Sequence, residues 1–319
     1  MACFICADIE TANLCPLCQN LSVCTNHQNL HQTSDSCFPY KIDCHKYKGR
    51  ILVATQNIPA GQVIFEETPL FSGPAKTSTP ICLACLGPKI PQIKCKCSFP
   101  MCSKECVEKH QNLPECGILA ENLPFFEDKL DYQAILPLRC LLAKNKSSKW
   151  EYLQMFEDHI QDRKMTSIWT SDRQKIVQQI REKWRQNEFE EDEIFRVEGI
   201  IDINTLELLE PEFEHSEVST PRAFYPLTSF CSHSCVNNTF RTLKNDGQGT
   251  LQTRAKMDIG QGEEITLHYA GGLKGRILRR TLLAEGWFFA CRCKRFDFIL
   301  FHEFFFQLQN SPSNFFLST

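Results

Sequence analysis

The sequence predicts an α+β protein in which short β-sheets are separated by cysteine-rich and helical segments. Three observations support this prediction. Strand-like runs with turn signals occur around residues 48–69 and 229–269. Clusters of cysteine and histidine occupy residues 1–43 and 79–117, and apolar residues recur at helical spacing within residues 118–200. Strands and helices segregated along a chain in this way are typical of the α+β class.

Bulk properties exclude several classes of function. The chain has 319 residues, 42% of them hydrophobic, and a net charge of -3, so no overall basic field attracts nucleic acid. No apolar run reaches the roughly 18 residues that a membrane helix needs. Because Asp8 and Glu10 come early, we expect no secretory signal. The chain has 19 cysteines, and Cys-x-x-Cys pairs mixed with histidine recur among them, which indicates zinc in a reducing compartment, the nucleus or the cytoplasm.

The first cluster, residues 1–43, is too short to fold on an apolar core, so we expect metal to supply its folding energy. Its eight potential ligands are Cys3, Cys6, Cys15, Cys18, Cys24, His27, His31 and Cys37. Eight ligands suit two tetrahedral zinc ions. The segment resembles a B-box, and we expect interleaved pairing, with Cys3, Cys6, Cys24 and His27 on one ion and the other four on the second. The alternative is a redox-labile tail with chance spacing.

Two strand-turn-strand units are expected, because one pattern occurs twice. The matching residues, at identical offsets, are Ala54, Ile58, Gly61 and Ile64 in the first unit and Ala255, Ile259, Gly262 and Ile265 in the second. β-rich residues flank the Pro/Gly turn of the first unit. Such an internal repeat predicts two similar structural units.

The second cluster, residues 79–117, again offers ligands for two zinc ions. They are Cys82, Cys85, Cys95, Cys97, Cys102, Cys106, His110 and Cys116. The segment resembles a MYND finger, although the Cys95-x-Cys97 pair and the spacing of His110 and Cys116 depart from the usual pattern. The resemblance implies binding of a proline-containing peptide.

The segment between the second cluster and the later strands reads as helical. Trp150, Leu153, Phe156 and Ile160 recur at helical spacing, and so do Ile176, Ile180 and Trp184. We expect an amphipathic bundle that packs on the sheet. Residues 196–204 return to strand-like composition, which predicts a strand ending near Asn204.

Two motifs follow: Cys-Ser-His-Ser-Cys-Val-Asn-Asn at Cys231–Asn238 and Gly-Glu-Glu-Ile-Thr-Leu-His-Tyr at Gly262–Tyr269. They resemble the C-terminal half of a SET domain, the lysine-methylating fold. Ser232 stands where that family has Asn, and Asn237 where it has Pro. With the interrupting finger, the order of segments is similar to SET-and-MYND-domain (SMYD-type) proteins, most of all the arthropod SmydA branch.

The resemblance implies a SET-domain β-clip of short sheets, split by a MYND zinc finger and a helical insert, with an N-terminal zinc finger. The implied segments are an N-terminal finger at 1–43, a first SET part at 44–78, a MYND-type finger at 79–117, a helical insert at 118–200, a second SET part at 201–286, a partial post-SET at 287–295 and a Phe-rich tail at 296–319.

The resemblance also implies methyl transfer from S-adenosylmethionine to a protein lysine. Tyr269 would be the catalytic residue. The positive charge of the sulfonium disperses as the methyl group leaves, so the site needs oxygens that stabilise this charge and hold the amine and the methyl group in line. Donor contacts would come from Lys48, Arg50, Ser232, His233, Tyr269 and Phe289. Asn204 and Trp287 would line the substrate channel. The shorter side chain of Ser232 would weaken donor binding, at a cost of about 1 to 3 kcal/mol.

A further zinc site is implied at Cys235, Cys291 and Cys293, where Phe296 replaces the fourth cysteine of the post-SET pattern. Three ligands are one short of a closed structural site. A short helix from Arg276, closed by Gly286, should precede it. The Phe-rich composition of the tail at 296–319 is consistent with two interpretations: a truncated or aberrant end, or an amphipathic helix. Two functions therefore stay open: an active lysine methyltransferase, or a catalytically weak zinc-finger scaffold that binds protein partners in transcriptional regulation.

Overall fold

The computed structural model describes residues 3, 10–17, 19, 22–25, 28, 37–76, 81–87, 93–122, 130–208, 221–244, 246–270 and 275–293. The predictions for Cys6, Cys18, His27 and His31, and for the tail from residue 296, lie outside these ranges. None of the helices in the described ranges has the length and apolar character that crossing a membrane requires.

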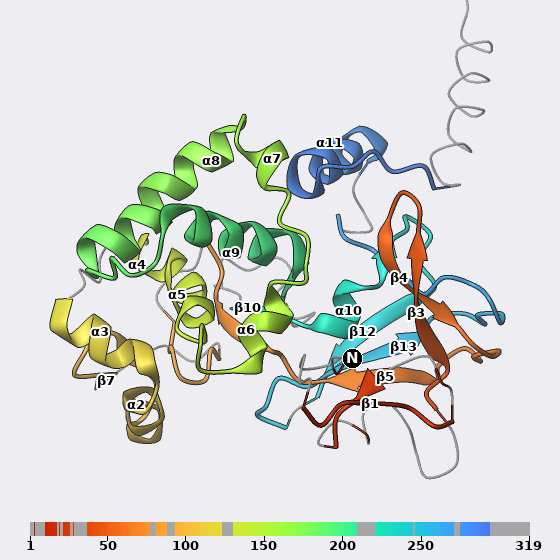
Figure 1. Ribbon diagram of the computed structural model, residues 1–319, viewed down its shortest axis with the longest axis horizontal. Coiled ribbons are helices and arrows are strands. Elements are labelled where there is room, and N and C mark those ends of the chain that lie inside the picture. The colour runs from red at the N-terminus through yellow and green to blue at the C-terminus, as the bar shows by residue number, and fades with distance from the viewer. Residues whose placement is uncertain are drawn as a thin grey trace, which may run out of the picture.

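Most of the strands lie in one half of the molecule and most of the helices in the other, while β7 lies beside α2 and α3 in the helical half (Figure 1). The strands are β1 (Asn13–Leu14), β2 (Ser22–Val23), β3 (Tyr40–His45), β4 (Gly49–Ala54), β5 (Val63–Glu67), β6 (Phe71–Pro74), β7 (Ile93–Lys94), β8 (Pro100–Met101), β9 (Thr205–Glu207), β10 (Pro221–Phe224), β11 (Ser232–His233), β12 (Thr239–Leu243), β13 (Leu251–Ala255) and β14 (Thr266–Leu267). They pair in the orders β12-β13-β5, β6-β10-β9, β3-β4, β11-β14, β1-β2 and β7-β8.

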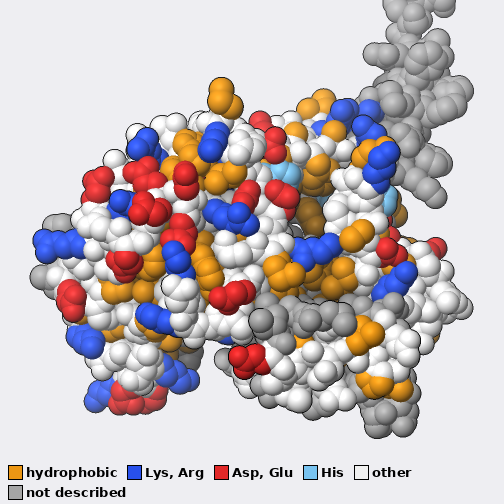
Figure 2. Space-filling view, viewed as in Figure 1, with side chains coloured by type: hydrophobic (Ala, Val, Ile, Leu, Met, Phe, Trp, Pro, Cys, Tyr) orange, Lys and Arg blue, Asp and Glu red, His pale blue; other side chains and the backbone are white. Residues whose placement is uncertain are grey.

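The helices are α2 (Lys104–Gln111), α3 (Pro114–Asn122), α4 (Leu130–Gln133), α5 (Ile135–Leu141), α6 (Ser148–Leu153), α7 (Ile160–Arg163), α8 (Ser167–Asp172), the π-helical turns η1 (Arg173–Val177) and η2 (Gln179–Lys183), α9 (Glu191–Asn204), α10 (Pro226–Ser229) and α11 (Arg276–Trp287). All but α10 and α11 lie in the finger and helical half, while α11 covers the junction of the two halves beside α7 (Figure 1). On the face shown in Figure 2, acidic and basic side chains are intermixed over the helical half.

The two predicted strand-turn-strand units pair with each other in the structure. Ile58 and Ile259 bond reciprocally, each amide donating to the other's carbonyl at 2.9 Å. The Gly61 amide donates to the Ala255 carbonyl, and the Gly262 amide donates to the Ala54 carbonyl. The two glycines have φ of +83° and +84°, a region that strongly favours glycine. The repeat in sequence therefore corresponds to a near-symmetric contact that joins residues two hundred positions apart.

The same pairing brings the first SET segment against the second. The Leu52 amide donates to the Phe230 carbonyl at 3.1 Å, and the Ile265 amide donates to the Leu52 carbonyl at 2.8 Å. Leu52 of β4, Ile64 of β5 and Ile265, which directly precedes β14, are fully buried in this contact. Residues 48–69 and 231–269 thus form one structural unit despite the long insertion.

Two sequence expectations about helices are corrected. The strand expected at residues 196–204 is the C-terminal part of α9, so Asn204 ends a helix. Its Ile-rich run packs against several helices at once and is buried on more than one face, which resembles a strand pattern. Gly286 does not close the last helix; α11 continues to Trp287 and ends at Phe288, whose φ is +56°.

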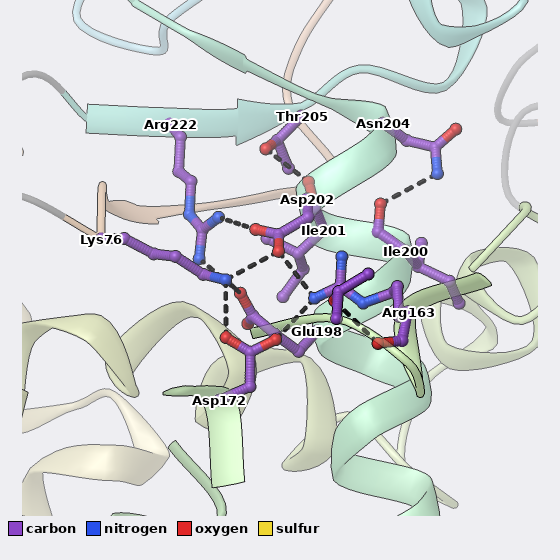
Figure 3. A network of polar contacts seen from close by, with 11 residues as sticks. Lys76, Arg163, Asp172, Glu198, Ile200, Ile201, Asp202, Asn204, Thr205 and Arg222 are labelled. Carbon is purple, nitrogen blue, oxygen red and sulfur yellow. Dashed lines mark hydrogen bonds and ion pairs between the residues drawn. The ribbon is translucent and has the colours of Figure 1, made fainter. Parts of the chain in front are cut away.

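A buried ion-pair network joins the insert to the SET sheets (Figure 3). Its three cations and three carboxylates are Lys76, Arg163, Arg222, Asp172, Glu198 and Asp202. Lys76 follows β6 and Arg222 lies in β10, whereas the carboxylates come from α8 and α9. Opposite charges in equal number let these groups be buried together.

Candidate active site and zinc sites

The site is built on β11, which α10 positions. α10 is a single turn, and the buried carboxylate of Glu67, at the end of β5, accepts hydrogen bonds from the backbone amides of Leu227 and Thr228 at 2.9 and 2.7 Å. The Thr228 hydroxyl donates to the same carboxylate. Burial raises the pKa of Glu67 to about 7, against the opposing effect of these hydrogen bonds. Glu67 thereby fixes the turn from which Cys231 and β11 begin.

Tyr269 has a fixed hydroxyl. It donates to the carbonyl of Cys231 at 2.6 Å. Burial holds the pKa of Tyr269 well above its usual range, so the phenol stays protonated at neutral pH. With its proton committed to Cys231, the oxygen can only offer lone pairs to an incoming group. Tyr269 can therefore orient an amine or a CH donor but cannot serve as a base.

His233 is held between Tyr269 and Cys235. Its Nδ1 accepts the backbone amide of Tyr269 at 3.1 Å, and its Nε2 lies 3.3 Å from the Cys235 Sγ. Burial lowers the pKa of His233 to about 4, so the ring is neutral. Since Nδ1 accepts, Nε2 must carry the proton and donate to sulfur. The histidine thus fixes the Tyr269 backbone, and that proton leaves Nε2 no lone pair to offer a metal.

Ser232 and Lys48 meet through Glu264, which the sequence analysis did not select. The Ser232 hydroxyl donates to one carboxylate oxygen of Glu264, and Lys48 Nζ lies 2.6 Å from the other. The Ser232 hydroxyl is therefore engaged within the protein. The Lys48–Glu264 pair presents one ammonium and one carboxylate side by side, which complements the charges of an α-amino acid.

Arg50 lies apart from this pair, against aromatic rings. Its guanidinium carbon is 5.0 Å from the Phe156 ring centroid and 4.8 Å from that of Phe230, and it donates to the Met155 carbonyl. Burial lowers its pKa. Cation–π contacts of this kind fix the guanidinium while leaving other N–H donors of the fork available.

Aromatic residues from the end of α11 complete the site. The Trp287 ring lies 5.4 Å from that of Tyr269, and the Phe289 ring lies 5.9 Å from that of His233. The Trp287 indole donates to the Ile203 carbonyl at 3.1 Å, next to Asn204. The Asn204 amide nitrogen donates to the Glu157 and Ile200 carbonyls, so it links the end of α9 to the segment between α6 and α7. The Asn204 side chain therefore stabilises the C-terminal end of α9, next to the carbonyl that Trp287 contacts.

The residues of the second cluster form two groups suited to zinc. Cys82, Cys85, Cys102 and Cys106 form the first, here called zinc site 1, and Cys95, Cys97, His110 and Cys116 form zinc site 2. Within each group the ligand atoms all lie within 4.8 Å of one another. Four sulfur or nitrogen ligands converging at this spacing fit tetrahedral zinc.

Two other predicted metal groups are only partly visible. In the N-terminal segment, the Sγ atoms of Cys15 and Cys37, predicted on one ion, lie 3.5 Å apart, and Cys3 and Cys24 are buried. At the post-SET site, Cys235 and Cys291 approach each other together with His233, and Cys235 also meets the side chain of Cys293. Because Nε2 of His233 carries a proton, the described residues there supply three thiols.

The family model of the SET domain matches residues 49–270, more than half of the chain. The chain belongs to the SET-domain family. This confirms the predicted α+β fold, a SET domain divided by a finger and a helical insert. The matched span includes the second cysteine-rich cluster and the helical segment that follows it.

The chain is similar in sequence to several members of this family, including the following three. The SET domain-containing protein SmydA-8, isoform A, of Drosophila melanogaster is 28% identical over 257 residues, covering 77% of this chain and 54% of its own. A SET and MYND domain-containing protein of Dictyostelium discoideum is 26% identical, covering 73% and 76%. The histone-lysine N-methyltransferase ATXR4 of Arabidopsis thaliana is 22% identical, covering 88% and 92%. The chain thus spans about half the length of the first of these.

Proposed function

We propose that this SET-domain protein transfers a methyl group from S-adenosylmethionine to a lysine of a protein substrate. The contact that supports this most directly is the Tyr269 hydroxyl bonded to the Cys231 carbonyl, with a neutral His233 holding the tyrosine backbone. The name of the Arabidopsis relative, a histone-lysine N-methyltransferase, agrees with it. When bound, the donor would supply the methyl group on a sulfonium.

The residues of the site fit such a donor. Lys48 would meet the carboxylate of its amino-acid end, and Phe289 would stack on its adenine. Arg50 has remaining N–H donors for a second contact. These assignments follow the charges and rings that the structure brings together.

The chain's own groups would act on the lysine by orientation. Trp287 would flank the channel, and Tyr269 would accept a hydrogen bond from the amine or from CH groups on the methyl. Since Tyr269 stays protonated, the lysine must reach the site neutral, which desolvation in an aromatic channel favours. Holding the nucleophile in line is the main catalytic contribution that such a site offers.

A second candidate function is a weakly active scaffold whose fingers bind proteins. Two features support it. The Ser232 hydroxyl is bonded to Glu264 and so is not available to contact S-adenosylmethionine. The post-SET group has only three thiols among the described residues, so the segment that carries Phe289 is held by fewer metal ligands. In this case the MYND-type zinc finger, predicted at 79–117, would take a proline-containing peptide. For both candidates we propose a nuclear or cytoplasmic location, where zinc-binding thiols stay reduced.

Calorimetric titration of S-adenosylmethionine into zinc-replete full-length protein separates the two. The proposal predicts saturable binding in the micromolar range, and loss of it on Lys48→Met. Binding absent up to millimolar donor would overturn the methyltransferase assignment and favour the scaffold.

A further inference from the structure

His110 in zinc site 2 has two faces with different partners. The residue lies on α2 and is fully buried. Its Nε2 is 3.3 Å from the Cys97 Sγ, within the ligand group. Its Nδ1 points the other way, 3.8 Å from a carboxylate oxygen of Glu115. The ring is therefore oriented to ligate through Nε2, while Nδ1, a buried atom with no hydrogen-bond partner in the described part of the chain, points at the Glu115 carboxylate from beyond hydrogen-bond distance.

Glu115 is unusual for an acidic residue because it is only 1% exposed. It lies in the first turn of α3, directly before the ligand Cys116. Its Oε1 receives Arg139 of α5, with the Nε at 2.9 Å and an Nη at 2.8 Å. A buried carboxylate needs such a counter-charge. Zinc site 2 thus has an ion pair directly behind its histidine.

Arg139 extends this contact to two other parts of the molecule. One Nη donates to the Ser72 carbonyl in β6 at 2.8 Å, and the other donates to the Leu83 carbonyl at 2.6 Å. Leu83 lies between the zinc site 1 ligands Cys82 and Cys85. The helix of Arg139 is itself tight on β6, since a Cβ on Gly73 would come within 2.8 Å of the Leu136 Cβ. One guanidinium therefore joins finger, insert and SET sheet.

We infer that Glu115 positions His110 for zinc and that Arg139 couples zinc site 2 to the packing of the finger on the SET sheet. A carboxylate behind a metal-bound histidine favours the tautomer whose second N–H faces it and raises ligand basicity. The finger is then held in a fixed position against the SET sheet. This inference concerns metal binding and is independent of whether the protein methylates lysine.

The test is Glu115→Gln in the zinc-loaded full-length protein, challenged with increasing chelator. Metal-bound thiols resist alkylation, so peptide mapping of alkylated cysteines reports each site separately. Cys95, Cys97 and Cys116 should lose protection at about 10- to 100-fold less chelator than in the parent protein. The thiols of zinc site 1 should keep theirs. Glu105→Gln, an exposed acidic residue in the first turn of α2, is the matched control and should change neither site.

Arg139→Met tests the coupling. In the parent, stripping zinc should raise amide hydrogen exchange in β6; in the variant, β6 should exchange fast with or without zinc. Equal loss of protection at both zinc sites in Glu115→Gln would show general unfolding and overturn the positioning role, as would unchanged protection. If Glu115→Gln fails to fold, the shorter Glu115→Asp, which keeps the charge but shifts the acceptor, should give a smaller selective loss. A β6 exchange rate insensitive to zinc in the parent would overturn the coupling.

Discussion

At the scale of one residue, the role of the Tyr269 hydroxyl can be tested without changing how the ring packs. In Tyr269→Phe the ring contacts with His233 and Trp287 remain, but the oxygen bonded to the Cys231 carbonyl is lost. We expect donor affinity within about threefold of the parent and methyl transfer lower by about 10²- to 10³-fold, the effect of removing one oriented polar group at a reacting centre. Calorimetry and a radiolabelled transfer assay measure the two quantities.

Tyr225→Phe is the matched control for this substitution. The Tyr225 hydroxyl makes the same kind of bond, to the Gly249 carbonyl at 2.6 Å, but away from the site. Its removal should cost about 1 kcal/mol of stability and leave transfer unchanged. Equal losses of transfer in both variants would mean that the Tyr269 hydroxyl only stabilises the fold.

Glu67 gives a prediction about pH. Burial raises its pKa from an ordinary 4.5 to about 7, so the folded protein holds this proton more tightly than the unfolded chain. Its stabilising contribution is therefore complete below about pH 4.5 and is lost as pH rises through 7. Compared with Glu67→Gln, the parent's free energy of unfolding should fall by about 2 to 3 kcal/mol between pH 5 and 8. Urea unfolding of both proteins across that range measures the difference.

The neighbouring Glu66 supplies the control for the pH effect. Although partial burial opposes it, hydrogen bonds from Gln252 and Lys244 lower the pKa of Glu66. The gap between parent and Glu66→Gln should therefore stay constant above about pH 5.5, because the carboxylate is ionised throughout in both states. A flat gap for Glu67→Gln as well would contradict the assignment of the titration to Glu67.

At the scale of elements, the sequence predicted those features that depend on the spacing of residues within a short segment. The repeat containing Gly61 and Gly262 predicted two similar units, which the structure then pairs with each other, and the cysteine spacings predicted the residues that form zinc sites 1 and 2. Contacts made across the chain had no such signal: Glu67 meets Thr228 and Glu264 meets Ser232 only after folding. The error at residues 196–204 has a similar cause, because a helix buried on several faces loses its amphipathic period.

The paired turns make a prediction about two elements together. Gly61→Ala and Gly262→Ala each force a side chain into a left-handed conformation, although neither Cβ would meet a neighbour within 4 Å. Each substitution should cost about 1 to 2 kcal/mol, and the near-symmetric contact predicts equal costs. Gly117→Ala in α3, equally uncrowded but with ordinary φ, should instead stabilise by up to about 1 kcal/mol. Thermal unfolding measures all three; a neutral Gly262→Ala would refute the strain.

At the scale of the whole molecule, the buried network of Figure 3 determines whether insert and SET sheets hold together. Arg222 on β10 bonds both Glu198 and Asp202 of α9, at 3.3 and 3.0 Å. Arg222→Met leaves the buried carboxylates in excess of the remaining cations by one charge. We expect a loss of about 3 to 5 kcal/mol in the free energy of unfolding, measured in urea.

Two further variants decide whether that loss comes from buried charge. Arg173→Met removes an exposed arginine of the same insert, paired with Glu191 at 3.1 Å, and should cost less than about 1 kcal/mol. Adding Glu198→Met to Arg222→Met restores the balance of charge and fills the space with apolar atoms. Most of the lost stability should return, because a well-packed apolar pair can replace a buried ion pair at little cost. If the double variant were as unstable as Arg222→Met, the geometry of the arginine fork, and not charge balance, would be what joins the two halves.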